Sequence, residues 1–235
     1  MENLRRRDHI TEANVAGFID KYFYSKIKHL KTINIITRVT DKEQQYKGID
    51  LVVKNNEDYE FKIDEKVATN YTTKLNKFAF ELDSFQSDRL VPGWLVTDNE
   101  TDYYLLGWVE VVKDLMKDKY RLKTNEIISE EDILSLELIF VAKESIKEYL
   151  KKEGYDLEAL IEMAKDIRDG EVLLEKKMYL YKDEYDKNDT DFHFTKSGSK
   201  VEVPVMINIR KDKLIELGNK RLFIVDKNGI RTKRL

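Results

Sequence analysis

The chain has 235 residues, of which 41% are hydrophobic and 37% are charged, and its formal net charge is −3. The apolar content is sufficient for a core, so extensive disorder is not expected. There is no cysteine and there are only three histidines, which excludes disulfides, thiolate zinc sites and cysteine nucleophiles and disfavours a histidine-rich metal site. Residues 1–14 lack the apolar segment of a signal peptide, and no run approaches the ~18 apolar residues of a membrane span. We therefore expect a soluble, cytoplasmic protein.

The first third of the chain is predicted to form a helix followed by three strands. Thr11 resembles an N-cap, and apolar residues then recur at helical spacing, which predicts a helix from about Glu12 to Leu30. Alternation and β-branched residues predict a strand over residues 31–40. Two further strands are expected on either side of the polar turn NNED, over residues 49–54 and 58–68.

The rest of the chain is predicted to alternate between strands and helices. Strands are expected at residues 77–85, 93–97, 102–111, 136–142 and 221–226 and within 177–209. Of these, 93–97 and 102–111 are expected to pair as a hairpin. Helices are expected near residues 111–119, 143–154, 156–170 and 211–217, and the sequence SEED at 129–132 resembles a capping box. A change in composition near Glu171 predicts a core, residues 1–170, and a β-rich, basic C-terminal extension, residues 171–235, either separate or part of the same domain.

Two acids and a lysine are predicted to lie close together on the first hairpin. Facing residues of an antiparallel hairpin have a constant index sum, so a turn centred on Glu57 places Asp50 opposite Asp64. Because side chains alternate along a strand, Lys62, Asp64 and Lys66 share one face. Magnesium binds to one or two carboxylates together with waters and substrate phosphate oxygens. A lysine beside it can hold or deprotonate a metal-activated water, or stabilise charge at the phosphorus.

The sequences GID, ending at Asp50, and IDEK, containing Asp64-x-Lys66, resemble the motif of the PD-(D/E)xK nuclease superfamily. The separation of the two acids, 64 − 50 = 14 residues, suits the β-hairpin of that superfamily, and the helix and strand before it suit its α-β-β-β core. The resemblance implies an α/β (α+β), restriction-endonuclease-like fold with a mixed sheet flanked by helices. It implies a Mg²⁺- or Mn²⁺-dependent endonuclease, usually acting on DNA, with restriction or mobile-element roles among its members. It also implies that an acid on the first helix joins the metal ligands, and Glu12 matches that acid by position.

Two features depart from the motif of the superfamily. Glu65 occupies the middle position, where an apolar residue is more usual, so a charge faces inward. Glu60-x-Lys62 also fits the pattern, but its shorter separation from Asp50 requires a tighter hairpin, and we rank it second. The alternative to a nuclease is therefore a catalytically inactive, nuclease-like module that binds nucleic acid or protein. A nuclease acting on RNA with the same site is a third possibility.

Basic residues are concentrated at the C-terminal end of the chain. From Met206 to Leu235 there are nine basic and three acidic residues, 9 − 3 = +6. Such a segment either keeps the surface hydrated or contacts phosphate groups. The second interpretation assigns nucleic-acid binding, expected on double-stranded DNA, to Arg210, Lys211, Lys213, Lys220 and Arg221. Cutting of both strands would favour a homodimer.

Overall fold

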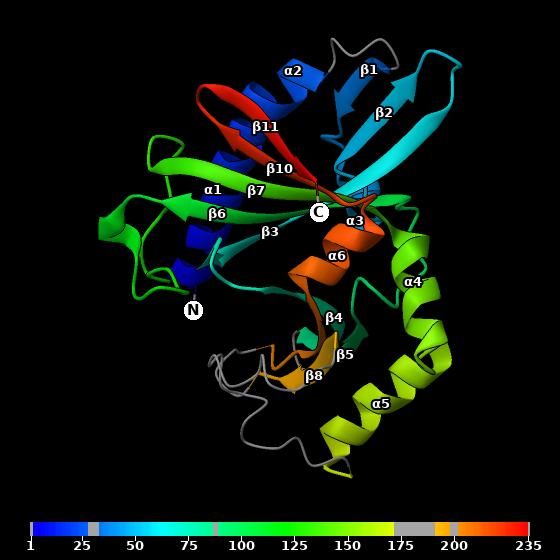
Figure 1. Ribbon diagram of the computed structural model, residues 1–235. Helices are drawn as coiled ribbons and strands as arrows, with labels where there is room; N and C mark the ends of the chain where they lie inside the picture. Colours follow the sequence, from blue (N-terminus) through cyan, green and yellow to red (C-terminus); the bar gives the residue numbers. More distant parts are fainter. Residues whose placement is uncertain (1, 28–32, 87–88, 172–190, 198–201, 235) are drawn as a thin grey trace. The chain divides into compact units, whose positions relative to one another are not determined.

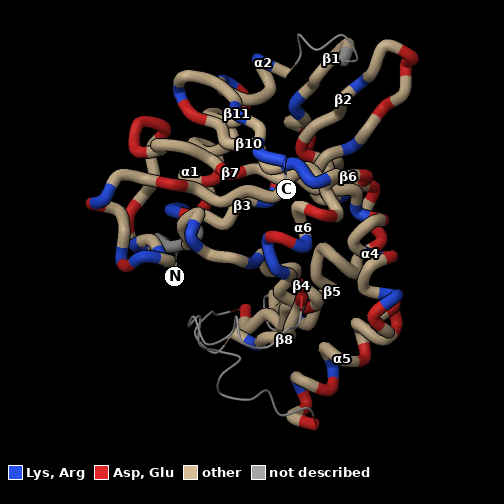
Figure 2. Tube along the Cα trace, viewed as in Figure 1, with Lys and Arg blue, Asp and Glu red and all other residues tan. Residues whose placement is uncertain are grey.

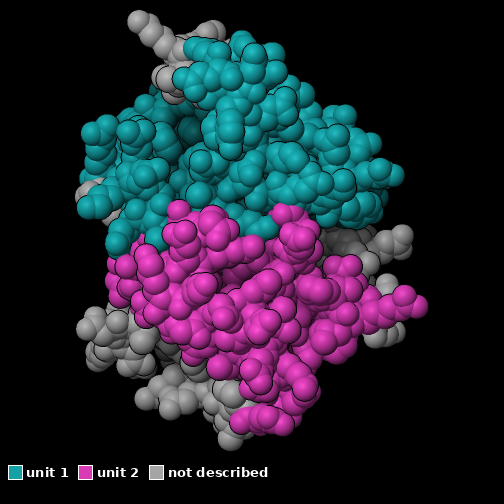
Figure 3. Space-filling view, turned by 90° about the vertical axis from the view of Figure 1, so that its right-hand side faces the viewer, with its two compact units in different colours: residues 1–76, 100–143, 215–235 teal, residues 77–99, 144–214 magenta. Residues whose placement is uncertain are grey.

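The computed structural model describes residues 2–27, 33–86, 89–171, 191–197 and 202–234, which form two compact units (Figures 1 and 3). Unit 1 comprises Met1–Asn76, Glu100–Lys143 and Ile215–Leu235, and unit 2 comprises Lys77–Asn99 and Glu144–Leu214. The units interleave along the chain, so they do not follow the boundary predicted near Glu171. The physical reason is strand pairing, because C-terminal strands join the sheet of unit 1 and a strand from residues 77–86 joins the sheet of unit 2.

Unit 1 is built on a seven-stranded mixed sheet. Its strands, in spatial order, are β1 (Ile33–Arg38), β2 (Leu51–Asn55), β3 (Glu60–Thr72), β6 (Tyr103–Val111), β7 (Ile133–Ala142), β10 (Arg221–Asp226) and β11 (Gly229–Arg234). All neighbours are antiparallel except β3 and β6, which run parallel. The predicted strands over 31–40, 49–54, 58–68, 102–111 and 136–142 are present with shifted ends, and the strand over 221–226 has the predicted ends. The mixed α/β class predicted from the sequence is therefore confirmed.

A long helix covers part of this sheet. Helix α1 (Glu2–Ile19) continues into a π-helical turn, η1 (Asp20–Tyr24), and a short α2 (Ser25–Ile27). The helix begins well before the predicted start, because Thr11 is not its cap: the Thr11 side chain is buried and its Oγ1 accepts a hydrogen bond from the main-chain N–H of Ile128. Apolar residues from α1, η1 and the strands form one core cluster, which includes Val15, Phe18, Ile19, Phe23, Leu51, Ile63, Leu105 and Leu138.

Unit 2 combines a four-stranded antiparallel sheet with helices. The strand order is β5 (Arg89–Pro92), β4 (Lys77–Gln86), β9 (Val205–Arg210) and β8 (Phe192–Lys196). Helix α5 (Leu157–Asp169) and all of α4 (Lys143–Lys152) except Lys143 belong to unit 2, whereas α6 (Lys211–Leu217) belongs to unit 2 only as far as Leu214. The three helices predicted from the sequence in this region are confirmed. The Asp156 side chain accepts from the Ala159 main-chain N–H to cap α5, and Gly170 ends this helix with φ of 83°. Residues 172–190 of the predicted extension lie outside the described residues.

Two local predictions were wrong. Residues 93–97 form a turn instead of a strand, because the Glu81 main chain lies where a Gly93 side chain would be and the Gly93 N–H donates to Leu82 O at 2.8 Å. The helix predicted over residues 111–119 is replaced by a short 3-10 turn, η2 (Lys113–Leu115). The short helix α3 (Lys42–Tyr46) was not predicted. In SEED, the reciprocal hydrogen bonds of a capping box are present: the Ser129 N–H donates to Asp132 Oδ2 at 2.9 Å and the Asp132 N–H donates to Ser129 Oγ at 3.4 Å. The turn leads into β7 and not into a helix. None of the described helices is long and apolar enough to cross a membrane.

Candidate functional site

The β2–β3 hairpin has the register predicted from the sequence. Leu51 faces Ile63 and Val52 faces Lys62, as a turn centred on Glu57 requires. One residue before β2, the Asp50 main-chain N–H donates to Ile63 O at 2.9 Å, which continues the ladder and brings Asp50 level with Asp64. The two acids therefore lie side by side on adjacent segments of unit 1.

Asp64 and Lys66 form a close ion pair on β3. The Lys66 Nζ lies 2.7 Å from Asp64 Oδ1, and the Asp64 side chain is 2% exposed whereas that of Lys66 is 31% exposed. Among the described residues, the other carboxylate oxygen, Asp64 Oδ2, is buried and has no hydrogen-bond partner. Burial raises the pKa of Asp64 to about 7 against the opposing charge of Lys66, and the nearby Asp50 carboxylate adds to the increase. Asp64 thus exchanges its proton near neutral pH and carries an oxygen that a ligand could use.

Lys66 keeps its positive charge in this setting. Desolvation lowers its pKa, but the Asp64 carboxylate outweighs desolvation, and Asp50 and Glu12 add to the effect, so the pKa of Lys66 is raised. A lysine with a raised pKa is an ammonium ion at neutral pH. Of the roles predicted for it, stabilising negative charge or holding a water therefore fits better than removing a proton.

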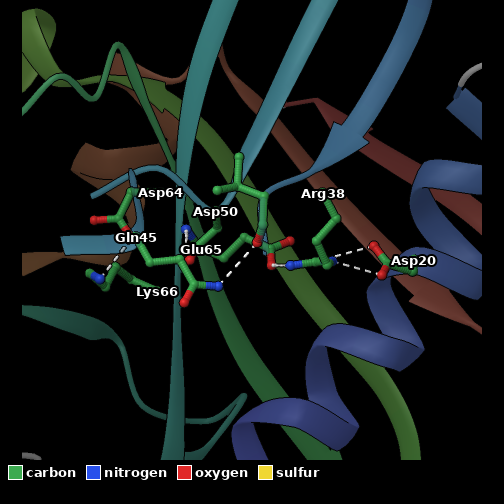
Figure 4. Close-up of polar contacts among 8 residues, drawn as sticks. Asp20, Arg38, Gln45, Asp50, Asp64, Glu65 and Lys66 are labelled. Carbon is green, nitrogen blue, oxygen red and sulfur yellow. Dashed lines mark hydrogen bonds and ion pairs between the residues drawn. The ribbon is translucent and has the colours of Figure 1, made fainter. Parts of the chain in front are cut away.

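Asp50 is held by main-chain contacts on both sides. The Val39 N–H donates to Asp50 O at 2.8 Å, and the Glu65 N–H donates to Asp50 Oδ2 at 2.8 Å. Gln45 on α3 supports the same region, because its side-chain amide donates to Val39 O at 3.0 Å. In Figure 4, Asp64 and Lys66 lie on one side of the view and Arg38 on the other, with Asp50 between them. The Asp50 carboxylate is therefore held by β3, and the Asp50 main chain by the residue that follows β1.

Glu65, the residue that departs from the superfamily motif, is neutralised by an arginine. Its side chain is 8% exposed, and its Oε2 accepts from Arg38 Nη1 at 2.8 Å. Arg38, at the end of β1, also donates twice to the Asp20 carboxylate at 2.7 Å. Desolvation raises the pKa of Glu65 even though Arg38 opposes it. The inward-facing charge that the sequence predicted is thus present and is paired.

Glu12 lies at the margin of this site. Its side chain is 63% exposed, and its Oε2 is 3.7 Å from His9 Nδ1. Partial desolvation raises the pKa of Glu12 against the charge of His9, with smaller effects from Asp8, Lys66 and Asp50. Glu12 is therefore close enough for the charges of Lys66 and Asp50 to affect its pKa.

The donor atoms of the hairpin suit a hard cation. In the described part of the chain, no three Asp, Glu or His side chains converge in a way that could hold a metal ion. Magnesium does not require three, because it retains several waters and binds through one or two carboxylates. Asp50 and Asp64 supply two carboxylates, and Asp64 Oδ2 is a buried oxygen without a hydrogen-bond partner among the described residues. The residues present therefore fit Mg²⁺ or Mn²⁺.

The five basic residues predicted to bind nucleic acid do not form one patch within a unit. Arg210, Lys211 and Lys213 belong to unit 2, whereas Lys220 and Arg221 belong to unit 1. Lys211 is 7% exposed. Arg210 pairs with Asp212 at 2.6 Å, and Lys213 pairs with Asp191 at 3.1 Å.

Lys220 and Arg221 are exposed, and Arg221 faces Arg234 on the neighbouring strand. Figure 2 shows further basic positions along β11 near the C-terminus. Within unit 1, the exposed basic surface therefore extends to β11, beyond the predicted residues.

No family model matches the chain. Neither the curated proteins nor the solved structures provide a match.

Sequence reasoning missed Arg38 and Asp20. The charged Glu65 at an inward-facing strand position was the one signal for them, because a buried carboxylate requires a cation or donors nearby. That signal predicts a partner but not its identity. Arg38 ends β1 and Asp20 follows α1, and only the tertiary structure brings them together.

Proposed function

We propose that the chain is a divalent-metal-dependent nuclease that hydrolyses phosphodiester bonds in nucleic acid, with double-stranded DNA as its substrate. The observation that carries the proposal is the buried Asp64 carboxylate, which lies level with Asp50 and 2.7 Å from Lys66. Burying a carboxylate is unfavourable, and a buried acid with a strongly raised pKa is characteristic of functional sites. Asp64 Oδ2 is buried without a hydrogen-bond partner within the described residues, so it remains available as a ligand.

Asp50 and Asp64 would hold Mg²⁺ or Mn²⁺. Glu12, at the margin of the site, would be a third acidic ligand. When bound, such an ion lowers the pKa of a coordinated water and polarises the phosphoryl oxygens. For binding, Asp64 must be ionised, which its pKa of about 7 permits at neutral and higher pH. The main-chain contacts of Asp50 keep its carboxylate in position without substrate.

Lys66 would act on the phosphate that is cut. Its side chain is 31% exposed and its ammonium group remains charged at neutral pH, so it can contact a phosphate oxygen and stabilise the additional negative charge of the transition state. The attacking water would be oriented by the same ammonium. This role follows from the charge that Asp64 helps Lys66 to retain.

The order of elements supports the resemblance to PD-(D/E)xK nucleases. Helix α1 precedes the antiparallel strands β1, β2 and β3, with the short α3 between β1 and β2, and this matches the α-β-β-β order expected of that core apart from α3. Both motif acids lie at the β2–β3 hairpin. A restriction-endonuclease-like core, a homodimer and a restriction or mobile-element role belong to this proposal by analogy with the superfamily.

Cleavage of supercoiled plasmid tests the proposal. Wild-type protein with Mg²⁺ or Mn²⁺ should nick or linearise the plasmid, and Asp64→Ala and Lys66→Ala should each abolish this activity. Asp212→Asn, which removes an exposed carboxylate in unit 2, is a matched control and should cut like wild type. Wild-type protein that cuts neither DNA nor RNA, and whose melting temperature does not respond to either metal, would refute the proposal.

The second candidate is a nuclease-like module that binds nucleic acid or protein without cutting. Two observations favour it: Lys66 already neutralises Asp64, and no group of three metal-binding side chains exists among the described residues. An inactive module should bind DNA in a gel-shift assay without added metal, and its affinity should be unchanged by Asp64→Asn. The nuclease proposal predicts instead that divalent metal strengthens the complex and that Asp64→Asn removes this gain.

A further inference from the structure

Arg38 joins three elements of unit 1 through one side chain. Its guanidinium donates from Nε and Nη2 to Asp20 on η1 and from Nη1 to Glu65 on β3, all at 2.7–2.8 Å, while its own main chain ends β1. Arginine is suited to this role because its planar group holds several donors in fixed directions. The guanidinium therefore connects the helical segment before β1 to the strand that carries the motif.

Glu65 links Arg38 to Asp50, one of the proposed metal ligands. Glu65 binds Arg38 through its side chain and binds Asp50 through its main chain, where its N–H donates to Asp50 Oδ2 at 2.8 Å. Glu65 also lies between Asp64 and Lys66 in the chain. A movement of Glu65 would consequently shift Asp50 and the two neighbouring residues together.

The helix is distorted at the residue that meets Arg38. The α-helical hydrogen-bonding of α1 changes to the π pattern at Asp20 and continues so to Tyr24. Inserted π turns occur frequently at functional sites. Tyr24 is buried, and its hydroxyl lies beside the Glu65 carboxylate. The charges of Glu65, Arg38 and Asp20 all act on this hydroxyl, so Tyr24 adjoins the same cluster.

We propose that Arg38 is a positioning residue of the nuclease site, which acts by fixing Glu65 and thereby the Asp50 carboxylate beside Asp64. Arg38 does not contact substrate or metal in this proposal. It sets the separation of the two carboxylates before the metal binds, and it fixes the helix that carries Glu12 relative to β3. The inference rests on the function proposed above and assigns a role to residues outside the motif.

A plain stabilising role is the competing explanation for this cluster. A buried ion pair contributes little net stability compared with apolar residues, yet removal of one partner is destabilising. Loss of stability on removing Arg38 is thus expected under both explanations. Metal affinity and turnover measured far below the melting temperature separate them.

The experiment compares wild type, Arg38→Met, Arg38→Lys and Asp20→Asn in the full chain. Mn²⁺ affinity is measured by calorimetry, and plasmid nicking is resolved into kcat and KM. Residues that orient metal ligands usually affect affinity or activity by 10- to 100-fold. We expect Arg38→Met to weaken Mn²⁺ binding or kcat by about that factor with KM for DNA unchanged, and Arg38→Lys to recover part of the loss. Asp20→Asn is the milder variant, because its carboxylate is 44% exposed and the amide retains one acceptor.

Arg168→Met is the matched control. Arg168 forms a comparably buried pair with Asp83 in unit 2, with both side chains 11% exposed, so its loss should lower the melting temperature without changing Mn²⁺ affinity or kcat. Equal Mn²⁺ affinity and kcat in wild type, Arg38→Met and Asp20→Asn would overturn the positioning role while the nuclease proposal stood. Wild-type protein that neither binds Mn²⁺ nor nicks DNA would overturn both.

Discussion

Asp64→Asn should make the metal-free protein more stable at neutral pH. Asparagine has nearly the same shape as aspartate but carries no charge, so it mimics the protonated acid. Asp64 is 2% exposed, and its burial raises the pKa from 3.8 to about 7. A carboxyl group with a raised pKa in the folded state binds its proton more tightly there than in the unfolded chain. Wild-type stability should therefore fall as the pH increases from about 4 to 7, and should then level off.

The pKa values set the size of this effect. One pKa unit corresponds to about 1.4 kcal/mol, so a shift from 3.8 to about 7 amounts to about 4 kcal/mol in the free energy of unfolding. The opposing attraction of Lys66 is already contained in that pKa. Relative to Asp64→Asn, wild type should lose about 1.4 kcal/mol per pH unit between pH 4 and 7. At pH 8 the variant should be more stable by as much as about 4 kcal/mol.

Urea denaturation of both proteins in the presence of a chelator, at several pH values from 4 to 8.5, measures this difference. Equal m-values would show that the variant changes stability and not the extent of unfolding. Asp212→Asn is the control with the opposite sign, because Arg210 outweighs desolvation and lowers the pKa of Asp212. Removing that carboxylate should slightly destabilise the protein above its unfolded pKa. Stability curves for wild type and Asp64→Asn that run parallel across this pH range would refute the burial argument.

Three other outcomes are expected. Mg²⁺ at about 100 times its dissociation constant should raise the free energy of unfolding of wild type at pH 8 by about 2.7 kcal/mol, measured by thermal denaturation. A similar increase in Asp64→Asn would contradict the assignment of Asp64 as a metal ligand. Gly93→Ala should lower the free energy of unfolding in urea by at least about 2 kcal/mol, because the alanine methyl group would meet the Glu81 main chain. A urea midpoint equal to that of wild type would disprove that contact. Asp156→Ala should cost about 1 kcal/mol through loss of the α5 cap, with Asp156→Asn close to wild type as the comparison.

Local patterns were sufficient for several elements. The register of the β2–β3 hairpin was predicted from its polar turn. Helix α5 was predicted together with its N-cap, Asp156, and its C-terminal residue Gly170. These features depend on residues close together in the sequence, where turn and capping preferences act directly. Residues 93–97 were assigned incorrectly because their alternation resembles a strand, while the contact of Gly93 with β4 decides the turn.

The sequence by itself determined the mixed α/β class and the alignment of Asp50 with Asp64, because both depend on side-chain periodicity and on one short turn. Only the tertiary structure decided that Asp64 is buried, since β3 lies inside a sheet whose other strands come from distant parts of the chain. It likewise decided how the Glu65 charge is neutralised, by bringing Arg38 and Asp20 together from separate elements. Burial and pairing of charges depend on contacts between distant residues, and these contacts set the pKa values that give the candidate site its chemistry.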